Sequence, residues 1–207
     1  MRRWRGRTAS GPSRNEGQRD VVVRCRRRPH EVTNLSALAE QRQAKDDFFA
    51  RHPQSPLTVA QRREFKGLRY YAENEALRLR LPLERGEQAE RIIMDTSTGD
   101  RRVYLRAGTV RFEVEGQEAE LALYAEEGAD GHEFFVPFRD ATSGRETYGA
   151  GRYLEAELAP DGTVLIDFNV AYNPYCAYND RWSCPLPPIE NWLKVAIRAG
   201  EMAFEEH

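Results

Sequence analysis

The segment that decides the fold is residues 164–201, which read VLIDFNVAYNPYCAYNDRWSCPLPPIENWLKVAIRAGE. It opens with apolar and polar side chains in alternation, so that Ile166 and Phe168 point to one side while Asp167 and Asn169 point to the other. Such alternation predicts a strand with one buried and one polar face. Side chains two residues apart on a strand are roughly 7 Å apart, so Asp167 and Asn169 are close enough to share one ligand or one hydrogen-bond network.

A Pro-rich polar loop follows this strand, and we place it at residues 170–191. An Asn-Pro step at residue 173 favours an extended or turning backbone, and three prolines between residues 185 and 188 keep the chain out of a helix. A loop of this length is functional or is fixed by its own contacts. The apolar spacing of residues 192–199 fits a helix or a strand, and the preceding prolines favour the strand.

Short segments of alternating hydrophobicity precede the loop, separated by turns that contain Gly. We expect strands at residues 77–83, 92–94, 103–105, 110–114, 119–123, 134–138, 153–158 and 164–169. The regular exchange of strand and helix that marks a parallel sheet is missing from this pattern. We therefore predict one mainly β domain over residues 65–207, an antiparallel barrel or bent sandwich of about eight strands.

A helical N-terminal segment is predicted at residues 34–64. Apolar side chains from Leu35 to Phe49 recur at helical spacing, and Pro53 ends this first helix. Thr58 is placed to cap a short second helix. We expect the segment to pack on one end of the barrel.

Charge is divided unevenly along the 207 residues, whose formal net charge is −2. Residues 1–28 contain ten Arg against Glu16 and Asp20, a balance of +8, so the rest carries −2 less +8, or −10. An acidic folded part argues against nucleic-acid binding by that part. The Arg-rich tail (1–33) lacks hydrophobic periodicity, and we predict that it is disordered. The alternative is a tail that contacts RNA or lipid, and we expect no other part of the chain to bind nucleic acid.

Three cysteines are present, Cys25 in the tail and Cys176 and Cys184 in the loop. The sequence shows no signal peptide and no apolar run of membrane-spanning length, so we expect a cytoplasmic protein with free thiols and no membrane partner. Oxidation could join Cys176 and Cys184 across a short loop. Their spacing matches no usual zinc signature, and we expect no metal ion and no cofactor.

Several segments of the chain are familiar as a set. They are PFRDATSGRETYGAGRYL (137–154), DFNVAYNPYCAYNDRWSCPLPPIENWL (167–193), IRAGE (197–201), KDDFFARHPQSPL (45–57), FKGLRYY (65–71) and GQEAELALY (116–124). Together they resemble the prokaryotic family catalogued as domain of unknown function 1684, over residues 39–202. The resemblance implies one intact domain, and it implies no activity, substrate, cofactor or catalytic residue.

A first candidate site is the loop at residues 139–149. Its Gly, hydroxyl and Arg residues could cradle an anion with backbone N–H groups and a guanidinium, although it lacks the ending of a nucleotide-binding P-loop. The alternative is a wide turn whose side chains bind their own backbone. The candidate ligand-binding residues here are Arg139, Asp140, Thr142, Ser143, Tyr148 and Arg152.

A second candidate site is a pocket of carboxylates and amides in the C-terminal segment. Asp167 or Glu190 would act as a general acid or base. The surrounding ligand-binding residues would be Asn169, Tyr172, Asn173, Tyr178 and Asn191. The alternative is a buried polar network that fixes the Pro-rich loop to the sheet.

Three functional hypotheses follow. The first is a domain that binds an unidentified small molecule in a polar pocket beside residues 167–191. The second is a metal-independent hydrolase or lyase that uses Asp167 or Glu190, and the third is a structural or protein-interaction module. An open pocket containing both carboxylates favours the first two, and complete pairing of the loop side chains favours the third. A carboxylate with a raised pKa that faces open space favours the enzyme over the binder.

Overall fold

The computed structural model describes residues 30–86, 90–129 and 131–204 of the chain. Residues 1–29, and with them most of the predicted tail (1–33), lie outside this description. The helix α1 (His30–Arg51) begins four residues before its predicted start at Asn34.

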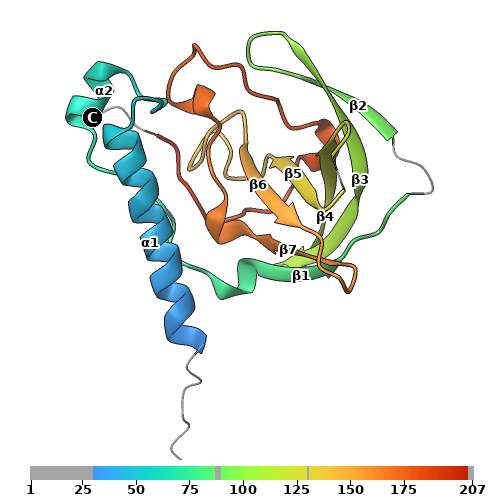
Figure 1. The fold of residues 1–207 in the computed structure, drawn as a ribbon. Coiled ribbons are helices and arrows are strands. Elements are labelled where there is room, and N and C mark those ends of the chain that lie inside the picture. Colours follow the sequence, from blue (N-terminus) through green and yellow to red (C-terminus); the bar gives the residue numbers. More distant parts are fainter. Residues whose placement is uncertain (1–29, 87–89, 130, 205–207) are drawn as a thin grey trace, which may run out of the picture.

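Seven strands in the described residues form two antiparallel sheets (Figure 1). They are β1 (Arg78–Pro82), β2 (Glu90–Asp95), β3 (Arg101–Val114), β4 (Gln117–Glu126), β5 (Glu133–Phe138), β6 (Arg152–Glu157) and β7 (Thr163–Asp167). The larger sheet has the order β2-β3-β4-β5-β6, and the smaller sheet pairs β1 with β7. Isolated bridges at Glu84–Thr109 and Leu158–Val164 join the margins of the two sheets, which do not close into a barrel. The bent-sandwich form of the prediction is therefore confirmed.

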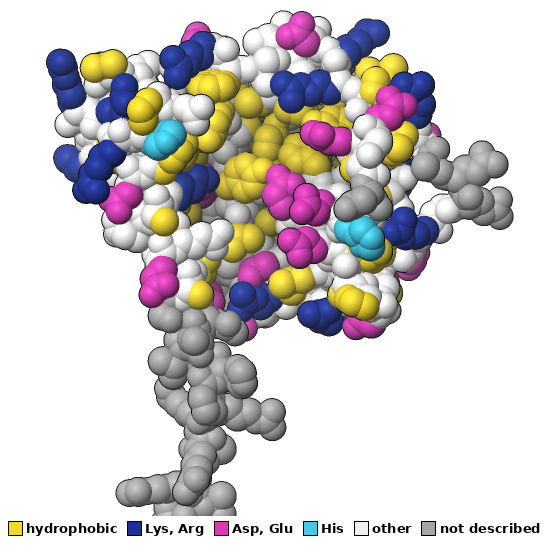
Figure 2. All heavy atoms as spheres, in the orientation of Figure 1, with side chains coloured by type: hydrophobic (Ala, Val, Ile, Leu, Met, Phe, Trp, Pro, Cys, Tyr) yellow, Lys and Arg dark blue, Asp and Glu magenta, His cyan; other side chains and the backbone are white. Residues whose placement is uncertain are grey.

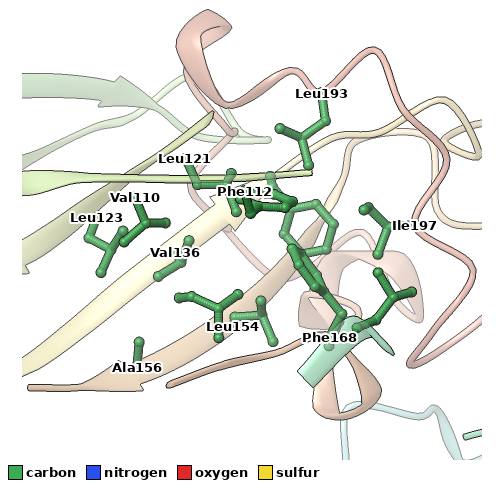
Figure 3. Close-up of a cluster of buried hydrophobic side chains, with 14 of the residues drawn as sticks. Val110, Phe112, Leu121, Leu123, Val136, Leu154, Ala156, Phe168, Leu193 and Ile197 are labelled. Atoms are coloured by element: carbon green, nitrogen blue, oxygen red, sulfur yellow. The ribbon is translucent and has the colours of Figure 1, made fainter. Parts of the chain in front are cut away.

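The main hydrophobic core lies between one face of the larger sheet and the chain that covers it (Figure 3). Leu121 and Leu123 of β4 are fully buried there, as their alternation along the strand requires. Phe168, just after β7, packs against Phe112 and Phe138 with ring centroids 5.6 and 5.4 Å apart. Burial of this apolar surface, worth about 25 cal/mol per Å², holds the layers together.

The helices lie at one side of the sheets (Figure 1). The short helix α2 (Val59–Glu64) begins with a capping box, in which the Thr58 hydroxyl accepts from the Gln61 N–H and the Gln61 side chain accepts from the Thr58 N–H. The prediction of Thr58 as the cap is confirmed. Phe49 of α1 is buried against Tyr178, with ring centroids 4.9 Å apart. In the described ranges, neither helix could serve as a membrane span by length and apolar character.

The C-terminal segment wraps around the sheets through short 3₁₀ turns: η2 (Phe168–Val170), η3 (Tyr175–Ala177) and η4 (Ile189–Asn191). The prediction of a strand at residues 192–199 is wrong. This part of the chain forms a single parallel bridge, at Trp192, and no continuous ladder of strand hydrogen bonds. Its alternating side chains are nevertheless buried. The carbonyl groups of Ile197, Ala199 and Glu201 accept from the Arg152 guanidinium instead of a neighbouring strand.

Candidate functional site

The face of the larger sheet opposite the core carries aromatic side chains on four strands. Each of these residues follows or precedes a core residue, so the pleat turns it outward. Tyr104 of β3 stacks on Phe135 of β5 with ring centroids 5.5 Å apart, and Phe135 meets Tyr153 of β6 edge-on at 4.7 Å. Tyr124 of β4 stands opposite Phe135 in the register. Tyr104, Phe135 and Tyr153 form a continuous aromatic floor, and Tyr124 lies fully buried beside it.

The C-terminal segment supplies the facing wall. Tyr172 lies edge-on to Tyr153 at 5.7 Å, and Tyr175 lies against Trp182 at 5.1 Å. The Tyr153 hydroxyl donates to the Pro185 carbonyl at 2.5 Å, and this hydrogen bond connects the C-terminal segment to β6. Between them is an open cleft of about 650 Å³, a volume typical of small-molecule sites. Figure 2 shows this hollow, which hydrophobic side chains line.

Negative charge gathers on one side of the cleft, where acidic side chains border the hollow in Figure 2. The lining contains three glutamates, Glu126, Glu133 and Glu155, against one arginine, Arg102. Partial desolvation raises the pKa of Glu155 although the residue is exposed overall, the hydrogen bond from Tyr172 opposes this increase, and the neighbouring charges of Glu133 and Glu126 add to it. The ionised form of Glu155 is thus short of positive partners, which a cation in the cleft would supply.

Glu155 and Tyr172 form a hydrogen-bonded pair across the cleft, in which the Tyr172 hydroxyl donates to Glu155 Oε1 at 2.5 Å. Burial, together with this carboxylate, raises the pKa of Tyr172 above its usual range. The phenol therefore stays protonated and acts as a donor. We call the cleft with this floor, wall and pair the aromatic cleft.

The loop at residues 139–149 is held by its own contacts rather than open to an anion. Arg152 is 1% exposed and pairs with Asp140 Oδ2 at 2.8 Å, while the rest of its hydrogen bonds go to backbone carbonyls. Asp140 Oδ1 also accepts from the Thr142 N–H at 2.7 Å, and the Ser143 hydroxyl accepts from the Asp140 N–H at 3.1 Å. Thr142 contacts the Thr147 hydroxyl at 2.8 Å. These contacts fit the alternative of a turn that binds itself.

Two further candidates of this loop are also engaged by protein. The Arg139 guanidinium lies 4.3 Å from the centre of the Trp192 ring, a cation–π contact. The Tyr148 hydroxyl donates to the Cys176 sulfur at 3.7 Å. Neither residue is among those that line the aromatic cleft.

The two candidate catalytic carboxylates have separate partners. Asp167 caps η2 by accepting from the Asn169 N–H, and its second oxygen pairs with Arg78 at 2.9 Å. Asn169 in turn exchanges two hydrogen bonds with the backbone of Asn74. Glu190 is exposed and accepts from the Tyr124 hydroxyl at 2.8 Å. Neither carboxylate lines the aromatic cleft.

The remaining candidates attach the C-terminal segment to the sheet and to α1. Asn191 is fully buried, and its amide bonds the N–H and C=O of Ala122 and the C=O of Pro137. Asn173, through its N–H, and Tyr178, through its hydroxyl, both donate to Glu201 Oε2. This set corresponds to the predicted alternative of a buried polar network.

Of the predicted site residues, all within the described part of the chain, Tyr172 alone lines the aromatic cleft. The sequence reasoning missed the floor and the glutamates. Their signal in the sequence is the alternation of Tyr153 and Glu155 with Leu154 and Ala156, which places an aromatic ring and a carboxylate on the face opposite the core. Across the described residues, no group of three or more His, Cys, Asp or Glu is arranged to hold a metal ion.

These contacts define a class of protein, an open antiparallel β-sandwich with a cleft between its larger sheet and a long C-terminal segment. The family model for "Protein of unknown function (DUF1684)" matches residues 63–202, and the chain belongs to this family. The resemblance inferred from the sequence is thereby confirmed.

A solved structure is also similar to this chain, the solution NMR structure of an uncharacterized protein from gene locus rrnAC0354 of Haloarcula marismortui. The two sequences are 36% identical, and the TM-score is 0.65. The match covers 86% of this chain and 98% of the other. No curated protein matches the chain.

Proposed function

We propose that this protein binds a small organic cation with an apolar body in the aromatic cleft. One observation carries the proposal: the same open cleft combines a continuous aromatic floor with three glutamates against one arginine. Aromatic faces attract cations through the ring quadrupole, and carboxylates add direct charge complementarity. An apolar body would displace water from the rings while the cationic group lies beside the glutamates.

The pair of Glu155 and Tyr172 is the element we expect to fix the orientation of the ligand. Glu155 is the carboxylate in contact with both the wall and the floor, since it bonds Tyr172 and stands opposite Phe135 in the register. The Tyr172 hydroxyl keeps one carboxylate oxygen in place and leaves the other available. The Lys45 ammonium already lies 5.1 Å from the centre of the Tyr172 ring, so an ammonium group of the ligand at the second oxygen would have only the other face of this ring to contact.

The other two hypotheses receive less support from these contacts. A hydrolase or lyase that uses Asp167 or Glu190 would need a carboxylate that is free to act on the substrate. Asp167 borders a second open hollow, but one of its oxygens accepts from the Asn169 N–H and the other pairs with Arg78, while Glu190 accepts from Tyr124. A purely structural module accounts for the buried network but not for an open acidic cleft. A cytoplasmic location remains a prediction from the sequence.

The test is a titration of the ¹⁵N-labelled protein with benzyltrimethylammonium, followed by NMR and calorimetry. Phenylacetate serves as the matched anion. We expect saturable shifts at backbone amides of Tyr104, Phe135 and Tyr172 with the cation and none with the anion. Equal binding of both ions, or shifts that avoid the cleft, would contradict the proposal.

Two variants locate the charge that matters. Glu155→Gln keeps the size of the side chain and removes its charge, so affinity for the cation should fall about tenfold, the value of one modest charge contact. Glu157→Gln is the matched control, because Glu157 is exposed on the same strand and does not line the aromatic cleft. An equal loss in both variants would indicate general surface charge rather than a specific site.

A further inference from the structure

Cys176 and Cys184 meet beside the aromatic cleft. The Cys176 N–H donates to the Cys184 sulfur at 3.3 Å, and the two thiols also share a hydrogen bond. Cys184 is 8% exposed and lines the cleft, while Cys176 is half-buried in η3. Cys184 therefore borders the cleft, while Cys176 lies behind it, outside the lining, and is the more exposed of the two residues.

The surroundings of the two sulfurs make them chemically unequal. A hydrogen bond from Cys184 lowers the pKa of Cys176, and hydrogen bonds from Tyr148 and Ser97 lower it further. Burial acts in the opposite direction and raises this pKa. The same shared hydrogen bond, followed by burial, raises the pKa of Cys184. Cys176, which accepts from the Tyr148 hydroxyl and is more exposed than Cys184, is therefore the sulfur that we expect to react as a thiolate, the reactive form of cysteine.

Both cysteines are also held in place by neighbouring groups. The Cys184 N–H donates to the Ser97 hydroxyl at 3.1 Å, and its carbonyl accepts from the Ser97 N–H at 2.9 Å. On the other side, the Tyr148 hydroxyl donates to the Cys176 sulfur at 3.7 Å. The close approach of the two residues is therefore fixed by the turn between β2 and β3 and by the loop before β6.

We propose that Cys176 and Cys184 form a peroxide-reactive dithiol, with Cys176 as the attacking residue and Cys184 as the resolving residue. The substrate class is hydrogen peroxide or a small organic hydroperoxide, which reaches the half-buried Cys176 from solvent. This assignment does not depend on the binding of a cation in the aromatic cleft.

The reaction balances in two steps. The Cys176 thiolate attacks one peroxide oxygen, the O–O bond breaks, and the leaving oxygen takes a proton and departs as water, or as an alcohol from an organic hydroperoxide. Cys176 is then a sulfenic acid. The Cys184 sulfur attacks the Cys176 sulfur, the S–O bond breaks, and the hydroxyl leaves as water with the Cys184 proton. The two thiols are oxidised to one disulfide, and the peroxide is reduced.

The resolving step becomes easier once the first step has occurred. The pKa of Cys184 is raised mainly by its hydrogen bond with Cys176, and the negative charge of Cys176 contributes to it. A neutral sulfenic acid at Cys176 removes that charge, so Cys184 loses its proton more readily. The order of attack therefore follows from the geometry and charge of the pair.

The experiment treats the full-length Cys25→Ser protein with one molar equivalent of hydrogen peroxide and follows it by intact-mass and peptide mass spectrometry. We expect the mass to fall by two hydrogen atoms, one linked peptide containing Cys176 and Cys184, and full reversal by dithiothreitol. With Cys184→Ser added, Cys176 should gain one oxygen and become trappable by dimedone. With Cys176→Ser added, Cys184 should react at least tenfold more slowly.

Tyr148→Phe tests the role of the hydroxyl donor, since it should slow the first step while the same disulfide still forms. The parent protein alone can overturn the proposal, whatever the stability of the variants. Oxygen addition at Cys176 without a link, a disulfide formed only between two chains, or thiols that react only in urea would each overturn it.

Discussion

At the scale of single residues, Asn191 shows how one side chain can replace part of a sheet. The pairing of β4 with β5 consists of the Tyr124–Phe135 pair, so the neighbouring backbone groups of Ala122 and Pro137 lack a partner strand. The Asn191 amide supplies the missing acceptor and both donors, at 2.8 to 2.9 Å. A buried polar group without a partner costs about 1–3 kcal/mol, so three such groups depend on this residue.

We therefore predict that Asn191→Ala lowers the free energy of unfolding by about 3 kcal/mol or more. Urea unfolding followed by circular dichroism measures the change. Asn179→Ala is the matched control in the same loop, because Asn179 is only partly buried and accepts one exposed hydrogen bond from the Arg181 N–H. A loss at Asn191 no larger than at Asn179 would show that the amide does not support the sheet.

The sequence could predict that these polar residues matter but not how. Asn169, Asn173 and Asn191 offer the same donors and acceptors to a ligand and to a backbone. The choice depends on whether unpaired N–H and C=O groups lie nearby, and that follows from the strand pairing. Both alternatives were open for each residue, and the structure places all three on backbone groups.

At the scale of elements, α1 is attached to the domain mainly by particular contacts rather than by a broad apolar face. The Lys45 ammonium pairs with the carboxylate of Glu201, which is nearly inaccessible to solvent. Asp46 accepts from the Leu68 N–H at 3.0 Å, and Phe49 is buried against the domain. The burial of Glu201 makes its pairing with Lys45 important, because an unpaired buried charge is costly.

We predict that Lys45→Met destabilises the protein by about 3 kcal/mol, since it removes the ammonium that pairs with the buried Glu201 carboxylate. The double variant with Glu201→Gln should recover part of the loss. Urea unfolding gives the free energies, and limited proteolysis shows whether α1 is released first. Arg51→Ala, which breaks an exposed pair with Asp47, should cost less than about 1 kcal/mol. No recovery in the double variant would contradict this explanation.

The elements themselves were largely predictable, because alternation along a strand reports which face is buried. The prediction of a strand at residues 192–199 failed because alternation reports burial and not strand pairing. Leu193, Val195 and Ile197 alternate and are buried, but alternation carries no information on whether a neighbouring strand is present. The partners here are the backbone of Arg139 and Ala141, for Leu193 and Val195, and the guanidinium of Arg152, for Ile197.

At the scale of the whole molecule, the larger sheet is covered on both faces, and the two covers differ. The core face is closed by β1, β7 and the end of the chain, whereas the other face is covered incompletely by the segment after Tyr172. The aromatic cleft is the uncovered part. Its residues extend in sequence from Arg102 to Pro185 and meet only through the strand order. A single segment such as residues 153–156 therefore indicates one aromatic and acidic face, but only the strand order shows which other residues lie beside it.

This arrangement leads to a prediction for the pH dependence of cation binding. Partial desolvation raises the pKa of Glu155, so this carboxyl takes up a proton at a higher pH than an ordinary glutamate does. A cation is attracted to the ionised form alone. Affinity for benzyltrimethylammonium should therefore be constant above the pKa of Glu155 and fall as the pH drops through it, by at most about tenfold per pH unit for one proton.

Calorimetric titrations from about pH 4 to about pH 8, a range that brackets a raised glutamate pKa, measure this curve. Binding should release protons near the midpoint, because the cation favours the ionised carboxylate. In Glu155→Gln the affinity should be lower, and the fall that comes from protonation of Glu155 should be absent. Glu157→Gln should keep the parent curve. A parent affinity that does not change with pH, or an equal change in both variants, would mean that Glu155 is not the group that receives the cation.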